Sequence, residues 1–168
     1  MSWSKKNNDV VLTDEQTNYL NILSSKLDFD IVVTSGFRTP ERQISAMFYK
    51  IEQGEDITKL YLDNDFAQSV IDAYPDVKAG ARAVQAYINR GGGKTMHLSG
   101  NAIDIRTKDL PQSKVDKIIE TVENMGDRAL YEPVPPHIDI SFRSDYTPKK
   151  NNYLIPVLLI GSLILWMR

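Results

Sequence analysis

The chain of 168 residues contains no cysteine and only two histidines, His97 and His137. The absence of cysteine excludes both a disulfide framework and a thiolate metal site, so any metal must be held by nitrogen and oxygen ligands. Each histidine lies beside a strand-like run that carries an aspartate. With 42% hydrophobic residues, a chain of this length can bury one ordinary core, and we expect one domain rather than two.

An excess of positive charge is also missing, because the formal net charge is -2. Three basic residues and no acidic residue follow position 148. Residues 1–148 therefore contain 17 basic and 22 acidic residues and carry a formal net charge of -5. An acidic globular part argues against a protein that binds nucleic acid. The N-terminus, MSWSKKNNDVV, lacks an apolar run of the length that a cleavable signal peptide requires.

Charge is absent from residues 153–167, YLIPVLLIGSLILWM. As a helix this run would be about 22 Å long, shorter than a hydrocarbon core of about 30 Å, so a span needs help from its flanks. Tyr153 and Trp166 suit the two interfaces, and neighbouring basic residues suit the headgroups. We interpret 153–168 as a minimal anchor in a lipid bilayer behind a basic linker at 147–152. A buried helix or a tail that docks on a partner is the alternative.

The remaining sequence predicts a polar arm at 1–12 and an α+β domain at 13–146. TDEQ at 13–16 forms a capping box at the start of a helix, and Thr39 with Pro40 begins the next helix. Helical periodicity or composition favours helices at 14–26, 40 to about 54, 66–73, 77–89 and 113–125. Alternation and β-branched runs favour strands at 31–34, 102–105, 129–131 and 137–141.

The two histidine regions have the composition of a metal site. Ile103 and Ile105 share one face of their strand, so Asp104 points the other way, where a carboxylate is costly unless paired or metal-bound. The alternation of HIDIS at 137–141 places His137 and Asp139 on one face as well. Two imidazoles and a carboxylate, with one position left for water, form the ligand set of a catalytic zinc site. We therefore predict that the His97, Asp104 and His137 side chains converge on Zn²⁺.

Arg38 follows the strand at 31–34 and precedes a helix, so it lies at the mouth of a strand-to-helix turn. Such turns often present functional side chains, because a strand aims the residue and a loop exposes it. The alternative is a surface arginine that pairs with Glu41 or Asp104.

Three motifs occur in one order: SGFRTPE at 35–41, HLSGNAIDI at 97–105 and HIDIS at 137–141. Together they resemble the zinc-dependent D-alanyl-D-alanine carboxypeptidases and L-alanyl-D-glutamate endopeptidases, a family that includes phage endolysins. The resemblance covers about residues 32–142. It implies a small antiparallel sheet that carries the metal site, with helices packed on its outer side. It also implies zinc ligation by His97, Asp104 and His137, and a role for Arg38 in steadying the substrate and the oxyanion.

The general base is the point at which the chain departs from the family pattern. The family places an acid three residues before the late histidine, and that position is Val134 here. The nearest upstream acid is Glu132, and the prolines that follow it could bend the chain back to the metal. We predict that Glu132 activates the attacking water and that Asp139, the other acid considered, orients an imidazole N–H.

These expectations combine into a zinc peptidase that acts on the stem peptide or cross-link of peptidoglycan. A C-terminal anchor without a signal peptide would leave the domain in the cytoplasm of an ordinary cell, away from the wall. A lysin on the virion membrane of a lipid-containing phage, beside other virion proteins, avoids that conflict. The alternative is a non-catalytic zinc-binding protein of a virion with a structural or wall-recognition role.

Overall fold

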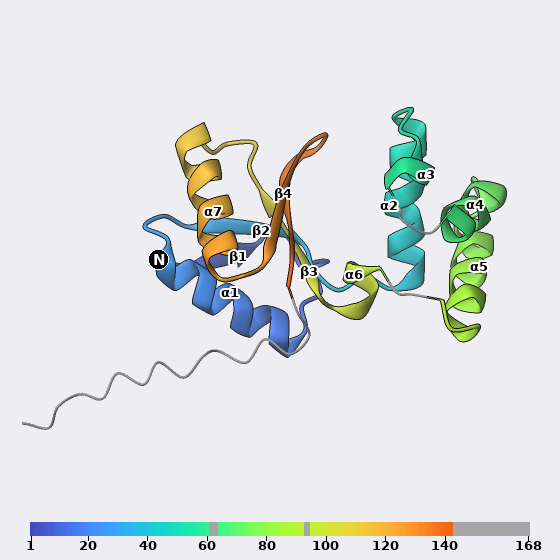
Figure 1. The fold of residues 1–168 in the computed structure, drawn as a ribbon, viewed down its shortest axis with the longest axis horizontal. Coiled ribbons are helices and arrows are strands. Elements are labelled where there is room, and N and C mark those ends of the chain that lie inside the picture. Colours follow the sequence, from blue (N-terminus) through green and yellow to red (C-terminus); the bar gives the residue numbers. More distant parts are fainter. Residues whose placement is uncertain (61–63, 93–94, 143–168) are drawn as a thin grey trace, which may run out of the picture.

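The computed structural model describes residues 1–60, 64–92 and 95–142 (Figure 1). Its fold is α+β, built on a five-stranded sheet in the order β1-β2-β3-β5-β4. The strands are β1 (Trp3–Lys5), β2 (Ile31–Ser35), β3 (Ala102–Arg106), β4 (Arg128–Pro133) and β5 (Pro136–Ser141). The helices are α1 (Asp14–Lys26), α2 (Pro40–Glu52), α3 (Ile57–Leu60), α4 (Asn64–Ala73), α5 (Val77–Asn89), α6 (Met96–Ser99) and α7 (Gln112–Asn124).

Local capping signals set the helix ends. The Thr13 hydroxyl accepts a hydrogen bond from the backbone N–H of Gln16, and the Gln16 side chain accepts one from the backbone N–H of Thr13. This reciprocal pair is the capping box expected from the sequence, and it satisfies two amide groups that the first turn leaves without partners. Thr39 caps α2 in the predicted way, with Pro40 in its first turn. The predicted starts of α1 and α2 are therefore confirmed.

The sheet is mixed, which corrects the expectation of an antiparallel sheet. β3 pairs antiparallel with β2 and β5, and β4 pairs antiparallel with β5, but β1 runs parallel to β2. The segment 1–12, predicted as a polar arm, contributes this edge strand. β1 is only three residues long, with one partly buried residue followed by two exposed ones, so it is too short to show a periodicity of its own. Its pairing is therefore set by the neighbouring strand.

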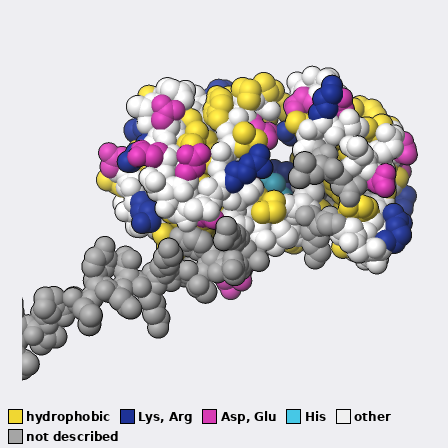
Figure 2. Space-filling view, viewed as in Figure 1, with side chains coloured by type: hydrophobic (Ala, Val, Ile, Leu, Met, Phe, Trp, Pro, Cys, Tyr) yellow, Lys and Arg dark blue, Asp and Glu magenta, His cyan; other side chains and the backbone are white. Residues whose placement is uncertain are grey.

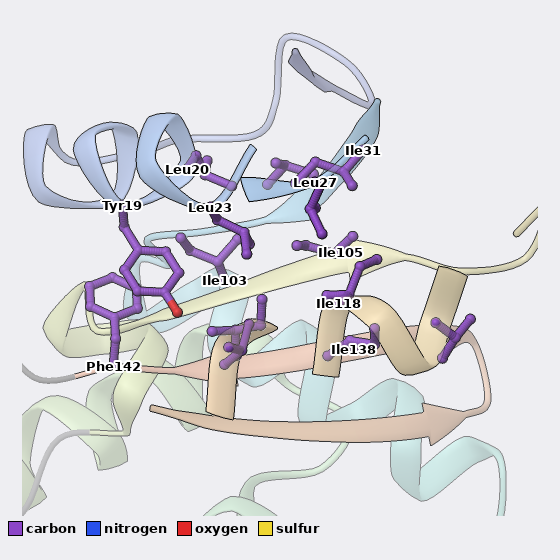
Figure 3. Close-up of a cluster of buried hydrophobic side chains, with 14 of the residues drawn as sticks. Tyr19, Leu20, Leu23, Leu27, Ile31, Ile103, Ile105, Ile118, Ile138 and Phe142 are labelled. Carbon is purple, nitrogen blue, oxygen red and sulfur yellow. The ribbon is translucent and has the colours of Figure 1, made fainter. Parts of the chain in front are cut away.

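One face of the sheet carries the main core (Figure 3). Ile103, Ile105 and Ile138 point from the central strands into apolar side chains of α1 and α7. At one end, the Tyr19 ring stacks on Phe142 with the ring centroids 4.4 Å apart. Since alternate residues of a strand point to opposite faces, the polar residues between these isoleucines all lie on the other face.

The helices α2, α3, α4 and α5, called here the helical lobe, form a second core away from the sheet (Figure 1). We expected the helices to pack on the outer side of the sheet, and among the described helices only α1 and α7 share the main core with it. The apolar faces of α2, α4 and α5 meet one another instead, through fully buried residues that include Ile44, Met47, Val70 and Val84. Leu98 of α6 joins this second core and ties the short helix to it.

No helix in the described ranges is long and apolar enough to cross a lipid bilayer. The predicted membrane anchor at 153–168 and the basic linker at 147–152 lie outside the described residues.

Candidate metal centre

A cleft of about 1140 Å³ separates the open face of the sheet from the helical lobe. Asp104, His137, Asp139 and Glu132 line it from the sheet, and Lys50 is among the residues that line it from α2. Figure 2 shows histidine at the bottom of the hollow between the two halves of the molecule, beside basic side chains. The cleft therefore gathers the chemically active residues that strand alternation predicts on this face.

His97 lies in α6, a single helical turn that immediately precedes β3. Thr95 caps this turn by accepting the N–H of Leu98, and Gly100 ends it in the left-handed conformation. The imidazole is buried, and its Nδ1 lies 2.8 Å from the carbonyl oxygen of Gly36. A carbonyl can only accept, so Nδ1 carries the proton and the Nε2 lone pair of the neutral ring points into the cleft.

His137, in β5, is held in the same way. Its Nδ1 lies 2.6 Å from the carbonyl oxygen of Pro135, two residues earlier, which fixes the proton on Nδ1. Its Nε2 is therefore also a lone-pair donor that faces the cleft. Metal-ligating histidines are typically oriented by such a hydrogen bond from the other ring nitrogen.

Asp104 is the point on which both imidazoles converge. Its Oδ1 lies 3.3 Å from Nε2 of His97 and 3.8 Å from Nε2 of His137. Burial alone would raise the pKa of this carboxyl, but the hydrogen bond and charge of His97, with the charges of Arg38 and His137, lower the pKa to about 2. The contribution of His97 to this lower pKa requires a proton on its Nε2; where both imidazoles are neutral with the proton on Nδ1, Oδ1 has no hydrogen-bond donor among the described residues. An ionised carboxylate and two lone pairs then face one another, and only a proton or a metal ion between them makes the arrangement favourable.

Asp139 brings a second carboxylate to the same place. It lies directly opposite Asp104 in the β3–β5 pair. Burial, followed by the charge of Asp104, raises the pKa of Asp139, and its Oδ1 is buried without a hydrogen-bond partner in the described part of the chain. Like charges at opposed positions destabilise a sheet unless a cation lies between them. The ligand atoms of His97, Asp104 and Asp139 all lie within 4.8 Å of one another, so these residues could hold a metal ion.

This group differs from the predicted ligand set in one member. His97 and Asp104 belong to both, whereas Asp139 takes the place that we gave to His137. The orienting hydrogen bonds that we expected from Asp139 come instead from the carbonyl groups of Gly36 and Pro135. Ligation by His137 stays a prediction, supported by the position of its Nε2.

Arg38 is fixed in the cleft by three contacts. Its Nη2 lies 2.6 Å from Asp104 Oδ2, its Nε donates to the Ser35 hydroxyl at 2.8 Å, and its Nη1 donates to Gln43 Oε1 at 3.4 Å. The ion pair with Asp104 is one of the two alternatives that the sequence left open. Arg38 therefore holds one carboxylate oxygen and leaves Oδ1 directed at the imidazoles.

Glu132 reaches the centre through the β4–β5 hairpin. It pairs with His137 in the register of the two strands, and its Oε2 lies 3.6 Å from Nε2 of His137. The five-residue separation in sequence is thus closed by a tight turn after Pro133, as the prolines suggested. On its other side, Glu132 Oε2 lies 2.8 Å from the Nζ atom of Lys50.

Sequence reasoning missed Lys50 altogether. The residue lies 82 positions from Glu132, and nothing local links the two. One signal was present in α2, where Gln43, Ala46 and Lys50 follow at helical spacing and all line the cleft. Residues at this spacing share one face of a helix. Where that face lies next to a predicted site, a polar residue on it is a candidate member of the site.

Replacing Gly100 by alanine is expected to lower the free energy of unfolding by about 1–2 kcal/mol through the side chain in the left-handed region, and by a further amount through the contact of its Cβ with Thr13. Gly100 has a φ of +80°, and a Cβ there would lie 3.2 Å from Cγ2 of Thr13. Gly54 has the same φ with nothing within 4 Å, so Gly54→Ala is a matched control. Urea unfolding measures both variants. A Gly100→Ala variant no less stable than Gly54→Ala would contradict the close approach to the capping residue of α1.

Comparison with known proteins gives no family for this chain: no family model matches it, and neither a curated protein nor a solved structure does.

Proposed function

We propose that this chain is a zinc-dependent peptidase that hydrolyses a bond in the stem peptide or cross-link of peptidoglycan. The observation that carries the proposal is the convergence of two Nε2 lone pairs on Oδ1 of Asp104, each ring fixed by a backbone carbonyl. Nitrogen and oxygen ligands in this combination suit Zn²⁺, and three of them leave one position open. The buried Oδ1 atom without a donor fits a metal in that place.

We propose His97, Asp104 and His137 as the zinc ligands. Zinc in such a site supplies a Lewis acid that polarises a carbonyl group and makes water acidic near neutral pH. Arg38 keeps Asp104 in its ligating orientation through the contact with Oδ2. Its positive charge also lies in the cleft, where it stabilises the negative charge that develops on the carbonyl oxygen of the scissile bond.

Glu132 is the base in this proposal. Its carboxylate lies on the cleft side of the hairpin, within 3.6 Å of a proposed ligand atom. It takes a proton from the attacking water as the new carbon–oxygen bond forms. It then gives that proton to the amine nitrogen as the carbon–nitrogen bond breaks, so the products are one carboxylate and one amine.

The peptidoglycan substrate is supported by the three ordered motifs and by the walls of the cleft. Basic side chains line it on both sides, among them Arg42 from α2 and Lys108 and Arg128 from the sheet side. Stem peptides carry free carboxylates, and a cleft with these cations offers partners for them. The proposal therefore assigns the basic walls to substrate binding in a chain whose overall charge is acidic.

Incubation of the zinc-loaded protein with purified peptidoglycan tests the proposal. We expect new amino termini in the digest, their loss after a chelator removes the metal, and their return when zinc is added back. A protein that binds one zinc per chain and releases no amino termini would refute the peptidase. That result would favour the second candidate, a non-catalytic zinc module, for which Asp139 supplies the specific observation, since a fourth protein ligand would close the site.

A further inference from the structure

Lys50 forms an ion pair across the cleft. It lies near the end of α2 in the helical lobe, and its Nζ is 2.8 Å from Oε2 of Glu132 on β4. A second carboxylate, Glu55, lies 3.8 Å from the same Nζ. The Lys50 side chain is 21% exposed, so the ion pair is partly shielded from water. Partial shielding strengthens a charge-assisted hydrogen bond and helps to fix its geometry. This ion pair joins the helical lobe to the sheet at the proposed metal site.

The Glu132 carboxylate is close enough to the candidate ligands to become a ligand itself. Its Oε2 lies 3.6 Å from Nε2 of His137, which in turn lies 3.8 Å from Asp104 Oδ1. Zinc binds carboxylates readily, and a site that holds the three proposed ligands His97, Asp104 and His137 would be filled by a further carboxylate. A base must stay off the metal, because a coordinated carboxylate neither leaves a position for water nor accepts its proton.

We infer that Lys50 is a positioning residue that holds the Glu132 carboxylate off the metal and so keeps one coordination position open. The inference rests on the proposed zinc site and on Glu132 as its base. Lys50 achieves this by drawing Oε2 towards the helical lobe. Because this ion pair joins α2 to β4, the position of Glu132 relative to the metal depends on the distance between the helical lobe and the β4–β5 hairpin.

Metal binding tests the inference without any assay of hydrolysis. Apo protein is titrated with Co²⁺, whose visible absorption weakens as the number of ligands rises, and with Zn²⁺. In Lys50→Met we expect Glu132 to join the metal, so that Co²⁺ absorbs more weakly and affinity rises roughly tenfold, the scale of effects next to metal ligands. Lys50→Arg keeps the charge and the hydrogen bond and should restore the wild-type spectrum. Lys59→Met, which removes an exposed lysine of α3 that does not line the cleft, should change neither quantity.

A double variant separates the role of Glu132 from a simple effect of charge. Removal of any nearby ammonium group strengthens cation binding by electrostatics alone. In a Glu132→Gln background, however, Lys50→Met has no carboxylate to release, so we expect the change in the Co²⁺ spectrum to disappear and the gain in affinity to shrink to the electrostatic part. An equal effect in both backgrounds would overturn the inference, and so would an unchanged spectrum and affinity in Lys50→Met itself.

Kinetics add a second readout where the wild-type protein hydrolyses peptidoglycan. Lys50→Met should lower kcat by roughly 100-fold, as expected for a misplaced base, with KM nearly unchanged. A merely structural role would instead lower the free energy of unfolding and leave the Co²⁺ spectrum as it is. Absence of hydrolysis in the wild-type protein would count against the peptidase and not against Lys50, because the metal-binding comparison does not depend on turnover.

Discussion

Glu132→Gln is expected to lower the rate of peptidoglycan hydrolysis by about 10² to 10⁴-fold, the range that a general base contributes. Glutamine has the size and shape of glutamate but accepts no proton at neutral pH. Because Glu132 is proposed as a base and not as a ligand, zinc content should stay at the wild-type level. Loss of turnover with retention of metal is the combination that separates a base from a ligand. Initial rates and elemental analysis of the same sample measure it.

Glu55→Gln is the matched control for this variant. Glu55 is the other carboxylate near Lys50, 3.8 Å from its Nζ, and it does not line the cleft. The substitution removes the same charge and should leave the rate within about twofold, since a surface ion pair contributes little. A Glu132→Gln variant that turns over as fast as Glu55→Gln would move the base to another group, with Asp139 the remaining carboxylate at the centre.

The helix ends were predictable because their causes are local. Thr13 with Gln16, and Thr39 with Pro40, act within a single turn, so the chain carries these signals wherever it folds. The edge strand β1 has no such signal: Trp3 pairs with Ile31 in a parallel register that depends on a strand 28 residues away. The same limit applies to the helical lobe, since an amphipathic helix shows its apolar face but not the partner that covers it.

The candidate metal centre likewise combines features with local causes and features that depend on distant elements. Alternation places Asp104, His137 and Asp139 on one face of adjoining strands, and the sequence motifs add His97. What the sequence could not give is the contact between elements. The carbonyl groups that hold the imidazoles belong to the backbone and leave no trace in residue type. Lys50 contacts Glu132 only because α2 packs along the opposite wall of the cleft, and the closeness of Asp139 to His97 and Asp104 becomes visible only once the strand register is known.

The ligand assignment leads to the second large effect, which concerns His137 and Asp139. We expect His137→Ala to remove zinc from the purified protein, because it deletes one of three proposed ligands and leaves the others too few for a stable site. Asp139→Asn should weaken binding by about 10 to 100-fold, the cost typical of a group that supports ligands without binding the metal. Asp109→Asn, at an exposed carboxylate paired with Arg106, serves as the control and should bind zinc like the wild type.

The pattern of these losses decides between the two candidate functions. If Asp139→Asn loses zinc as completely as His137→Ala does, all four side chains bind the metal, the site is closed, and the structural module gains over the peptidase. If His137→Ala retains zinc while Asp139→Asn loses it, the ligands are the three whose atoms lie within 4.8 Å of one another, and His137 is left free to donate or accept protons beside Glu132. Either outcome with three ligands leaves a zinc with an open position next to the Glu132 carboxylate that Lys50 contacts, whereas the outcome with four ligands closes the site. Whether the fourth position is open, more than the identity of the metal, therefore decides between the proposed hydrolase and a structural module.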